Sequence, residues 1–224
     1  MNIIRGPLPF QPFDEWAPVR VYHHLLLPHW RQEGGTYFVT FRLADSVPQT
    51  VLDQWADEIE WEKRGASLAG TNQSRDQDAV RSMIKRLHAY LDQGRGSCLL
   101  QDPGNAAVVA DALEHFHGSR VWTGDYVVMP NHVHALLTPF PGHELEGILH
   151  SIKSFTAMAL NRRMSRSGTL WQRDSYDHLV RDSVSLHRIQ EYIRNNPAKA
   201  GLRPGTYRLS EADYVGVASS RPPT

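Results

Sequence analysis

The chain has 224 residues, of which 41% are hydrophobic and 21% charged, and its formal net charge at neutral pH is zero. These values are ordinary for a globular protein and exclude a disordered or fibrous chain. A single cysteine, Cys98, excludes an intramolecular disulfide and a multi-thiolate zinc site. Because no run of about 18 apolar residues occurs and the first residues lack an apolar signal core, we expect a cytoplasmic protein without a membrane association.

The charge is unevenly distributed along the chain. Residues 151–208 contain 11 Lys and Arg side chains against 4 Asp and Glu, a local excess of seven positive charges. Such an excess can neutralise the phosphates of DNA. A solvated protein surface has a similar composition, so charge alone does not establish a DNA-binding face.

The first half of the chain shows one strand pattern and three helical patterns. Residues 37–43 alternate aromatic or branched side chains with smaller ones and predict the first strand. Residues 51–63 and 78–91 have helical spacing and are separated by a polar break at 65–77. A further helix is predicted over 106–116.

The second half continues with two short apolar runs, 120–129 and 132–139, which predict a strand, a turn and a strand. The long periodic segment 143–164 predicts an amphipathic helix. A strand over 170–180 and a last helix over 184–195 follow.

Two signals frame this last helix. Asp182 or Ser183 is a good N-cap, and we expect Pro197 to end the helix. The order of elements predicts an α+β fold, a ferredoxin-like sandwich with a central antiparallel sheet and an added C-terminal helix. We interpret residues 1–224 as one domain, in which 44–118 form a helical insertion or elaboration.

The chain contains two His-x-His triplets in different predicted elements. His115 and His117 lie in a helical pattern, where two residues correspond to about 200° of rotation, so their side chains point apart. His132 and His134 lie in a strand pattern, where side chains two apart project from one face, with about 7 Å between their backbones. The second pair can therefore share one cation. Two histidines on a sheet face are also common without a metal.

Tyr192 and Asn196 are four residues apart in the segment YIRNNP, so on a helix they lie on the same face. Because Pro197 disfavours helical geometry at the preceding residue, we expect the amide of Asn196 in the final turn. There it can cap the helix or bind an ion. The alternative is an Asn-Pro pair that simply ends the helix.

Four ordered blocks of the sequence resemble a known family. They are MPNHVHALL (129–137), SFTAMALNRR (154–163), GTLWQRDSYDHLVRD (168–182) and YIRNNPAKAGL (192–202). Together they resemble the HUH single-tyrosine transposases, and most closely the REP-associated tyrosine transposases of bacteria. The similarity is strong over about residues 120–205 and looser at 37–43, whereas 44–103 is longer and more acidic than a minimal core requires.

The resemblance implies an enzyme that nicks and rejoins single-stranded DNA. It implies that His132 and His134 bind a metal ion, that Asn196 is the third ligand, and that Tyr192 is the nucleophile of a 5′-phosphotyrosine intermediate. The implied cofactor is Mg²⁺ or Mn²⁺, in keeping with the preference of these metals for oxygen ligands. The implied substrate is single-stranded or hairpin DNA, and a homodimer is possible, with the tyrosine serving its own chain's metal or its partner's.

Other residues are candidates for DNA contacts. The basic candidates are Lys153, Arg162, Arg163, Arg173, Arg194 and Lys199. Trp171 can either stack on a base or belong to the core. Tyr176 is a rival nucleophile, which we interpret as a packing or DNA-contact residue.

Two other functions remain open from the sequence. One is a catalytically idle hairpin-binding protein derived from a transposase. The other is a metal-dependent hydrolase of a small molecule, with Tyr192 as a proton donor.

Overall fold

A computed structural model describes residues 5–24, 27–68 and 72–215. The elements in chain order are β1 (Arg5–Pro9), β2 (Arg20–His24), β3 (Leu27–Arg31), β4 (Tyr37–Arg42), α1 (Gln49–Leu68), α2 (Asn72–Leu91), the 3₁₀ turn η1 (Leu99–Gln101), α3 (Pro103–His115), β5 (Val121–Val128), β6 (His132–Pro139), α4 (Leu145–Arg163), β7 (Tyr176–Leu179), α5 (Ser183–Lys199), β8 (Arg208–Ser210) and β9 (Ala212–Val215).

The main sheet has five strands in the order β7-β4-β6-β5-β8, and all neighbouring strands are antiparallel. Helix α3 lies between β4 and β5 in the chain, and α4 lies between β6 and β7. This is the strand order and connectivity of a ferredoxin-like sandwich, with β8 added at one edge. The predicted α+β fold is therefore confirmed, and so is the added C-terminal helix, α5.

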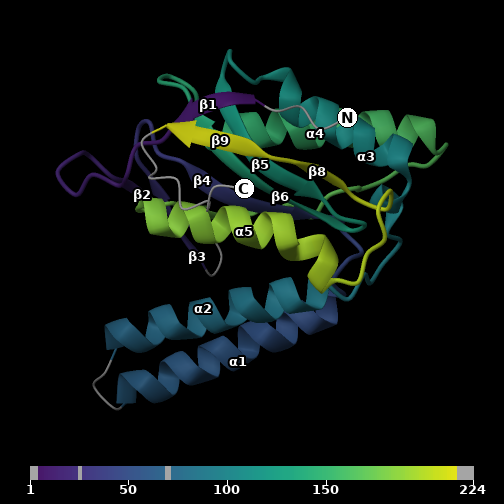
Figure 1. Cartoon of the computed structure of the whole chain (residues 1–224). Helices are drawn as coiled ribbons and strands as arrows, with labels where there is room; N and C mark the ends of the chain where they lie inside the picture. Colours follow the sequence, from purple (N-terminus) through teal and green to yellow (C-terminus); the bar gives the residue numbers. More distant parts are fainter. Residues whose placement is uncertain (1–4, 25–26, 69–71, 216–224) are drawn as a thin grey trace.

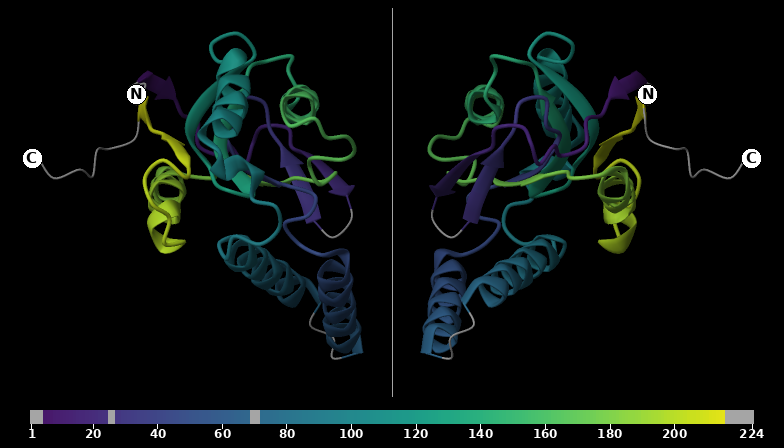
Figure 2. Two further views of the ribbon diagram at one scale, coloured as in Figure 1. Left: turned by 90° about the vertical axis from the view of Figure 1, so that its right-hand side faces the viewer. Right: turned by 90° about the vertical axis from the view of Figure 1, so that its left-hand side faces the viewer.

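The two faces of the sheet pack against different helices (Figures 1 and 2). On β6, Val133, Ala135 and Leu137 belong to the large core that includes α3 and α4. Leu136 points to the opposite face and packs with residues of α5. Because side chains alternate along a strand, His132 and His134 lie on this second face, beneath α5.

Helices α1 and α2 form a hairpin that projects from one end of the sandwich (Figures 1 and 2). The hairpin has a small core of its own, centred on Val47, Trp55 and Leu91. The end of α2 contacts the α5 face of the sheet, where His88 packs against His134 and the carbonyl of Leu91 accepts from Asn131.

In the part of the chain that the structure describes, no helix is both long and apolar enough to span a bilayer.

Two predicted boundaries were wrong, and several strands were not predicted. Residues 65–68 and 72–77 of the supposed break at 65–77 are helical, because polar residues do not by themselves break a helix. Of the predicted strand 170–180, only Tyr176–Leu179 pairs as a strand, apart from an isolated bridge at Trp171. Strands β1, β2, β3, β8 and β9 were not predicted.

Helix α5 also continues past the expected stop. Pro197 lies inside the helix and is buried. A proline removes one backbone donor, but the carbonyls of Asn196 and Pro197 still accept from the N–H groups of Ala200 and Leu202, at 3.0 and 2.9 Å. At the other end Asp182 is the N-cap, as predicted, and accepts from the N–H of Ser185 at 2.6 Å.

A buried ion pair joins the β2–β3 hairpin to the main sheet. The guanidinium of Arg31 donates to both carboxylate oxygens of Asp177 at 2.6 and 2.9 Å, and His29 contacts the same carboxylate at 2.6 Å. Burial alone would raise the pKa of Asp177, but the hydrogen bonds from His29 and Arg31 outweigh it and lower the pKa.

Replacing Asp177 with Ala should therefore lower the free energy of unfolding by about 3 kcal/mol, because the buried Arg31 charge loses its buried partner and keeps only the half-exposed Glu146. Chemical denaturation measures the change. The matched control is Glu144→Gln in the exposed Arg20–Glu144 pair, where we expect a loss below about 1 kcal/mol. Equal losses in the two variants would contradict the prediction.

Candidate metal and tyrosine site

His132 and His134 meet on the α5 face of β6. Their Nε2 atoms are 3.1 Å apart, and both side chains are fully buried. Burial lowers the pKa of His132 to about 3 and the pKa of His134 well below its ordinary value, so both rings are neutral at neutral pH. The same-face arrangement predicted from the strand spacing is present.

The proton position on His132 follows from its neighbour Asn131. The amide nitrogen of Asn131 donates to the carbonyls of Leu91 and Arg95 at 3.2 and 2.9 Å, so its oxygen faces the ring. That oxygen can only accept, at 2.7 Å, and Nδ1 of His132 must therefore carry the proton. The Nε2 atom is left with a free lone pair, as a metal ligand requires.

His134 is held by Thr40, whose hydroxyl lies 2.7 Å from Nδ1. When Thr40 accepts from the Nδ1–H group, Nε2 of His134 also presents a lone pair. Two lone pairs 3.1 Å apart repel each other unless a proton or a cation lies between them. Metal–nitrogen bonds of about 2.1 Å to one cation produce a separation of this size, so the pair fits a divalent ion.

Tyr192 on α5 brings its phenol to the histidine pair. Its Oη lies 3.4 Å from Nε2 of His134. The ring stacks on His88, with centroids 5.8 Å apart, and meets Phe38 edge-on at 5.9 Å. Burial and then the nearby charge of Asp92 raise the pKa of the phenol well above its ordinary value. This chain therefore holds its own tyrosine in place beside its own histidines.

Asn196, one helical turn after Tyr192, is fully buried. The side chain lies close enough to Asp92 and Tyr192 to favour their ionised forms. Among the described residues, however, neither its oxygen nor its nitrogen makes a hydrogen bond of good geometry. A buried amide without partners is costly, and an oxygen ligand to a cation would relieve that cost.

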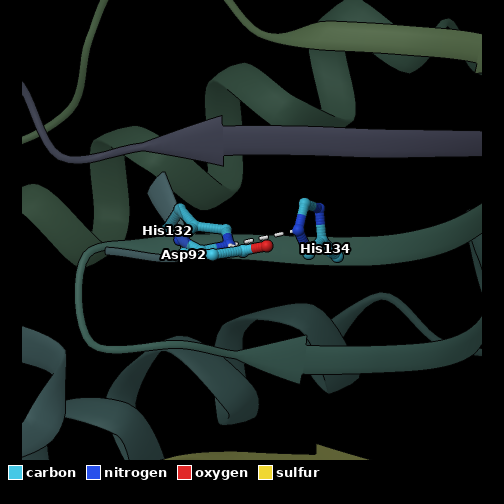
Figure 3. Close-up of side chains that lie close together, drawn as sticks. All are labelled: Asp92, His132 and His134. Atoms are coloured by element: carbon cyan, nitrogen blue, oxygen red, sulfur yellow. Dashed lines mark hydrogen bonds and ion pairs between the residues drawn. The ribbon is translucent and has the colours of Figure 1, made fainter. Parts of the chain in front are cut away.

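Two site residues come from the inserted hairpin and were missed in the sequence. Asp92, just after α2, places a carboxylate oxygen 3.9 Å from Nε2 of His132. This oxygen and the two Nε2 atoms all lie within 4.8 Å of one another (Figure 3). His88 packs against His134 at 5.1 Å between ring centroids. The spacing of His88 and Asp92, four residues on one helical pattern, was the available signal.

The site opens to solvent through a pocket of about 410 Å³ between the end of α2 and α5. Its lining residues are Ile84, Lys85, His88, Ala89, Asp92, Tyr176, Tyr192 and Lys199. Lys199 lies over the Tyr192 ring at 5.4 Å and is exposed. Of the seven candidate DNA-contact residues, this is the one at the site.

The other basic candidates lie elsewhere. The amine of Lys153 donates to the carbonyls of Gln172 and Arg173 at 2.8 and 2.7 Å, and burial lowers its pKa to about 8. Arg194 pairs with the buried Asp125 at 2.7 Å. Both are thus engaged within the protein. Arg162, Arg163 and Arg173 are exposed, the first two at the end of α4 on the opposite side of the sheet.

The two aromatic alternatives are also placed. Trp171 is buried, packs on Phe41 and donates its indole N–H to Thr156 at 2.8 Å, which agrees with its core interpretation and leaves no ring face for a base. Tyr176 lines the pocket and contacts Phe38 and His88 through its ring. Tyr192 is the tyrosine with the hydroxyl contact to His134.

Residues 112–196 match the family model described as "Transposase IS200 like". This match agrees with the resemblance to transposases noted in the sequence, and the matched segment contains His132, His134, Tyr192 and Asn196. A curated protein of Haemophilus influenzae, described as uncharacterized, is 31% identical over 35% of this chain and 55% of the relative. The chain therefore spans about half the length of that relative.

A solved structure described as a REP-associated tyrosine transposase bound to a REP hairpin is also similar. The match covers 77% of this chain and 72% of the other, with 17% sequence identity and a TM-score of 0.45.

Proposed function

We propose that this protein is a metal-dependent endonuclease and strand transferase that acts on single-stranded DNA through Tyr192. In this proposal residues 1–224 form one catalytic domain with a helical insertion. The observation that carries the proposal is that the phenol of Tyr192 meets the lone pairs of His132 and His134, with the buried amide of Asn196 next to Tyr192. The match to the IS200-like family over all four residues supports it.

The two histidines and Asn196 would hold a divalent ion, Mg²⁺ or Mn²⁺. When bound, the ion supplies positive charge that neutralises the scissile phosphate and favours an ionised phenol. Asn131 keeps Nε2 of His132 free of a proton, and Thr40 does the same for His134 when it accepts from the Nδ1–H group. The mixed nitrogen and oxygen donor set suits these metals better than a set of thiolates would.

Tyr192 would act as the nucleophile. Its Oη attacks phosphorus, the bond from phosphorus to the 3′ oxygen breaks, and the departing oxygen takes up a proton to become a 3′-hydroxyl. The DNA stays attached through its 5′ phosphate as a tyrosine ester. Attack on that ester by another 3′-hydroxyl would rejoin the strand and release the phenol, so no nucleotide cofactor is needed.

The surroundings of Tyr192 suit a positioned nucleophile. The ring is enclosed by Phe38, His88 and His134, so little rotamer freedom remains to be lost when DNA binds. Lys199, exposed at the rim of the pocket, would attract the phosphate backbone. Because the phenol lies below the surface of this pocket, we propose a strand that can leave its duplex as the substrate, such as the single-stranded flank of a hairpin.

The test is a cleavage assay with purified protein, Mn²⁺ and a panel of hairpin oligonucleotides that carry randomised single-stranded flanks and a 3′-end label. The expected product is a labelled protein–DNA adduct on a denaturing gel, together with an unlabelled fragment that ends in a 3′-hydroxyl. Hairpin binding without an adduct across the whole panel would favour the idle binding protein. Adduct-free hydrolysis of small phosphoesters would favour the hydrolase.

A further inference from the structure

We propose that Asp92 is a further protein ligand of the metal ion, supplied by the inserted hairpin, so that the cation ties the hairpin to the sheet. This inference rests on the proposed function for the presence of a metal, but it concerns a residue outside the segment that matches the transposase family. The site would then draw its ligands from β6, α5 and the end of α2.

The first argument is position. The Asp92 oxygen is 3.9 Å from Nε2 of His132, and the three ligand atoms lie within 4.8 Å of one another. Two ligands of one cation with bonds of about 2.1 Å are separated by roughly 3 Å when adjacent and about 4 Å when opposite. The histidine pair already has the first separation. Asp92 is already close to the second separation from His132, and rotation of its side chain can bring the carboxylate to an ion held by both histidines.

The second argument is the absence of other partners. Among the described residues, the Asp92 oxygen that faces the histidines has no hydrogen-bond partner and is buried, as are both amide atoms of Asn196. Two buried oxygens, one of Asp92 and one of the neighbouring Asn196, thus lack a good hydrogen bond beside the two histidines. Buried polar atoms are normally paired, and one cation would satisfy both oxygens. In Figure 3 the carboxylate of Asp92 and the two imidazoles point toward one another.

The third argument is that the fold holds Asp92 in this place. The backbone N–H of Asp92 donates to the carbonyl of His88 at 3.0 Å, so the residue continues the helical path of α2. One residue earlier, the carbonyl of Leu91 accepts from the Asn131 side chain, which also orients His132. The same amide therefore fixes both the end of the hairpin and one histidine ligand.

The charge balance favours the same assignment. Without Asp92 the ligand set of two neutral imidazoles and one amide has no charge to offset a divalent cation buried beside them. A carboxylate supplies one negative charge and is a preferred ligand of Mg²⁺ and Mn²⁺. The pocket beyond Asp92 remains open, which leaves access for a phosphate oxygen.

The test measures metal binding directly, in the full-length protein without DNA. Isothermal titration with MnCl₂ should give one site in the wild type and an affinity weaker by at least about tenfold in Asp92→Asn. The matched control is Asp57→Asn, which removes an exposed carboxylate from α1 of the same hairpin and should leave the affinity unchanged. Circular dichroism in EDTA checks that all three proteins are folded.

A second variant separates a ligand from a residue that only supports the fold. Asp92→Cys should weaken Mn²⁺ binding and strengthen Cd²⁺ binding, because a thiolate is a soft ligand. The control Asp57→Cys should change neither affinity. A residue that only supports the fold would weaken both metals or neither, so the exchange of preference is specific to direct coordination.

The outcomes distinguish this inference from the proposed function. Mn²⁺ binding that depends on His132 but is the same in Asp92→Asn would overturn the role of Asp92 and leave the nicking activity standing. Mn²⁺ binding that depends on Asp92, in a protein that forms no DNA adduct, would support the ligand and reject the nicking activity. No Mn²⁺ binding by the wild type would reject the ligand role outright.

Discussion

Tyr192→Phe is expected to abolish the covalent protein–DNA adduct while leaving hairpin binding unchanged. The substitution removes only the hydroxyl, whose oxygen lies 3.4 Å from Nε2 of His134, and keeps the ring that packs on Phe38 and His88. The chemistry therefore loses its nucleophile while the fold and the pocket persist. A denaturing gel measures the adduct, and a mobility shift at matched salt measures binding.

The matched control for this prediction is Tyr176→Phe. Tyr176 lines the same pocket and has a similar degree of burial, but its described contacts with site residues are made through the ring. This variant should retain the adduct. If Tyr176→Phe loses the adduct and Tyr192→Phe keeps it, the assignment of the nucleophile is reversed.

His134→Ala should abolish both metal binding and cleavage. His134 stands at the centre of the site, with Nε2 next to His132 and Tyr192 and Nδ1 bonded to Thr40. Loss of an outer-shell partner typically weakens a metal site by roughly 10- to 100-fold, so loss of a direct ligand should cost at least about 100-fold in Mn²⁺ affinity. Calorimetry and the adduct assay provide the two measurements.

The control uses the other histidine triplet. His115→Ala removes an exposed histidine at the end of α3, away from the site, and should leave Mn²⁺ affinity and cleavage unchanged. Full Mn²⁺ affinity in His134→Ala would mean that the ion, if bound, is held by other residues. That result would remove the basis of the proposed chemistry.

A mixture of the two inactive variants, Tyr192→Phe and His134→Ala, tests whether the tyrosine acts at the metal site of its own chain. In this structure the phenol contacts the histidine of its own chain, so neither protein in the mixture contains a complete site and no adduct should form. Recovery of the adduct in the mixture would show that two copies exchange their tyrosines, as in a dimer with a shared site.

The sequence was sufficient for the parts of this site that depend on local periodicity. Side chains two apart on a strand and four apart on a helix must share a face, and this placed His132 with His134 and Tyr192 with Asn196. The ferredoxin-like order was likewise readable from alternating strand and helix patterns. Such inferences need only the backbone geometry of one element at a time.

The rest depends on contacts between distant segments. Asp92 and His88 belong to the long, polar hairpin that the sequence analysis interpreted as an insertion. They reach the site only because the end of this hairpin lies beside α5. The role of Asn131 likewise depends on a carbonyl 40 residues away, at Leu91. Pro197 shows a second kind of failure. The proline predicts the end of a helix, but α5 continues because Pro197 is buried and because the carbonyls of Asn196 and Pro197 accept from later N–H groups.

The side chain of Asn131 has a consequence for anyone who wishes to shorten this protein. Its amide nitrogen donates to the carbonyls of Leu91 and Arg95 at and just after the end of α2, and its amide oxygen accepts from Nδ1 of His132. Excising the hairpin and closing the gap with a short linker would remove the carbonyls that accept from Asn131. The amide of Asn131 would then no longer be held, and the ring of His132 would lose its fixed orientation. The smallest working version of this chain is therefore larger than its sheet and three covering helices.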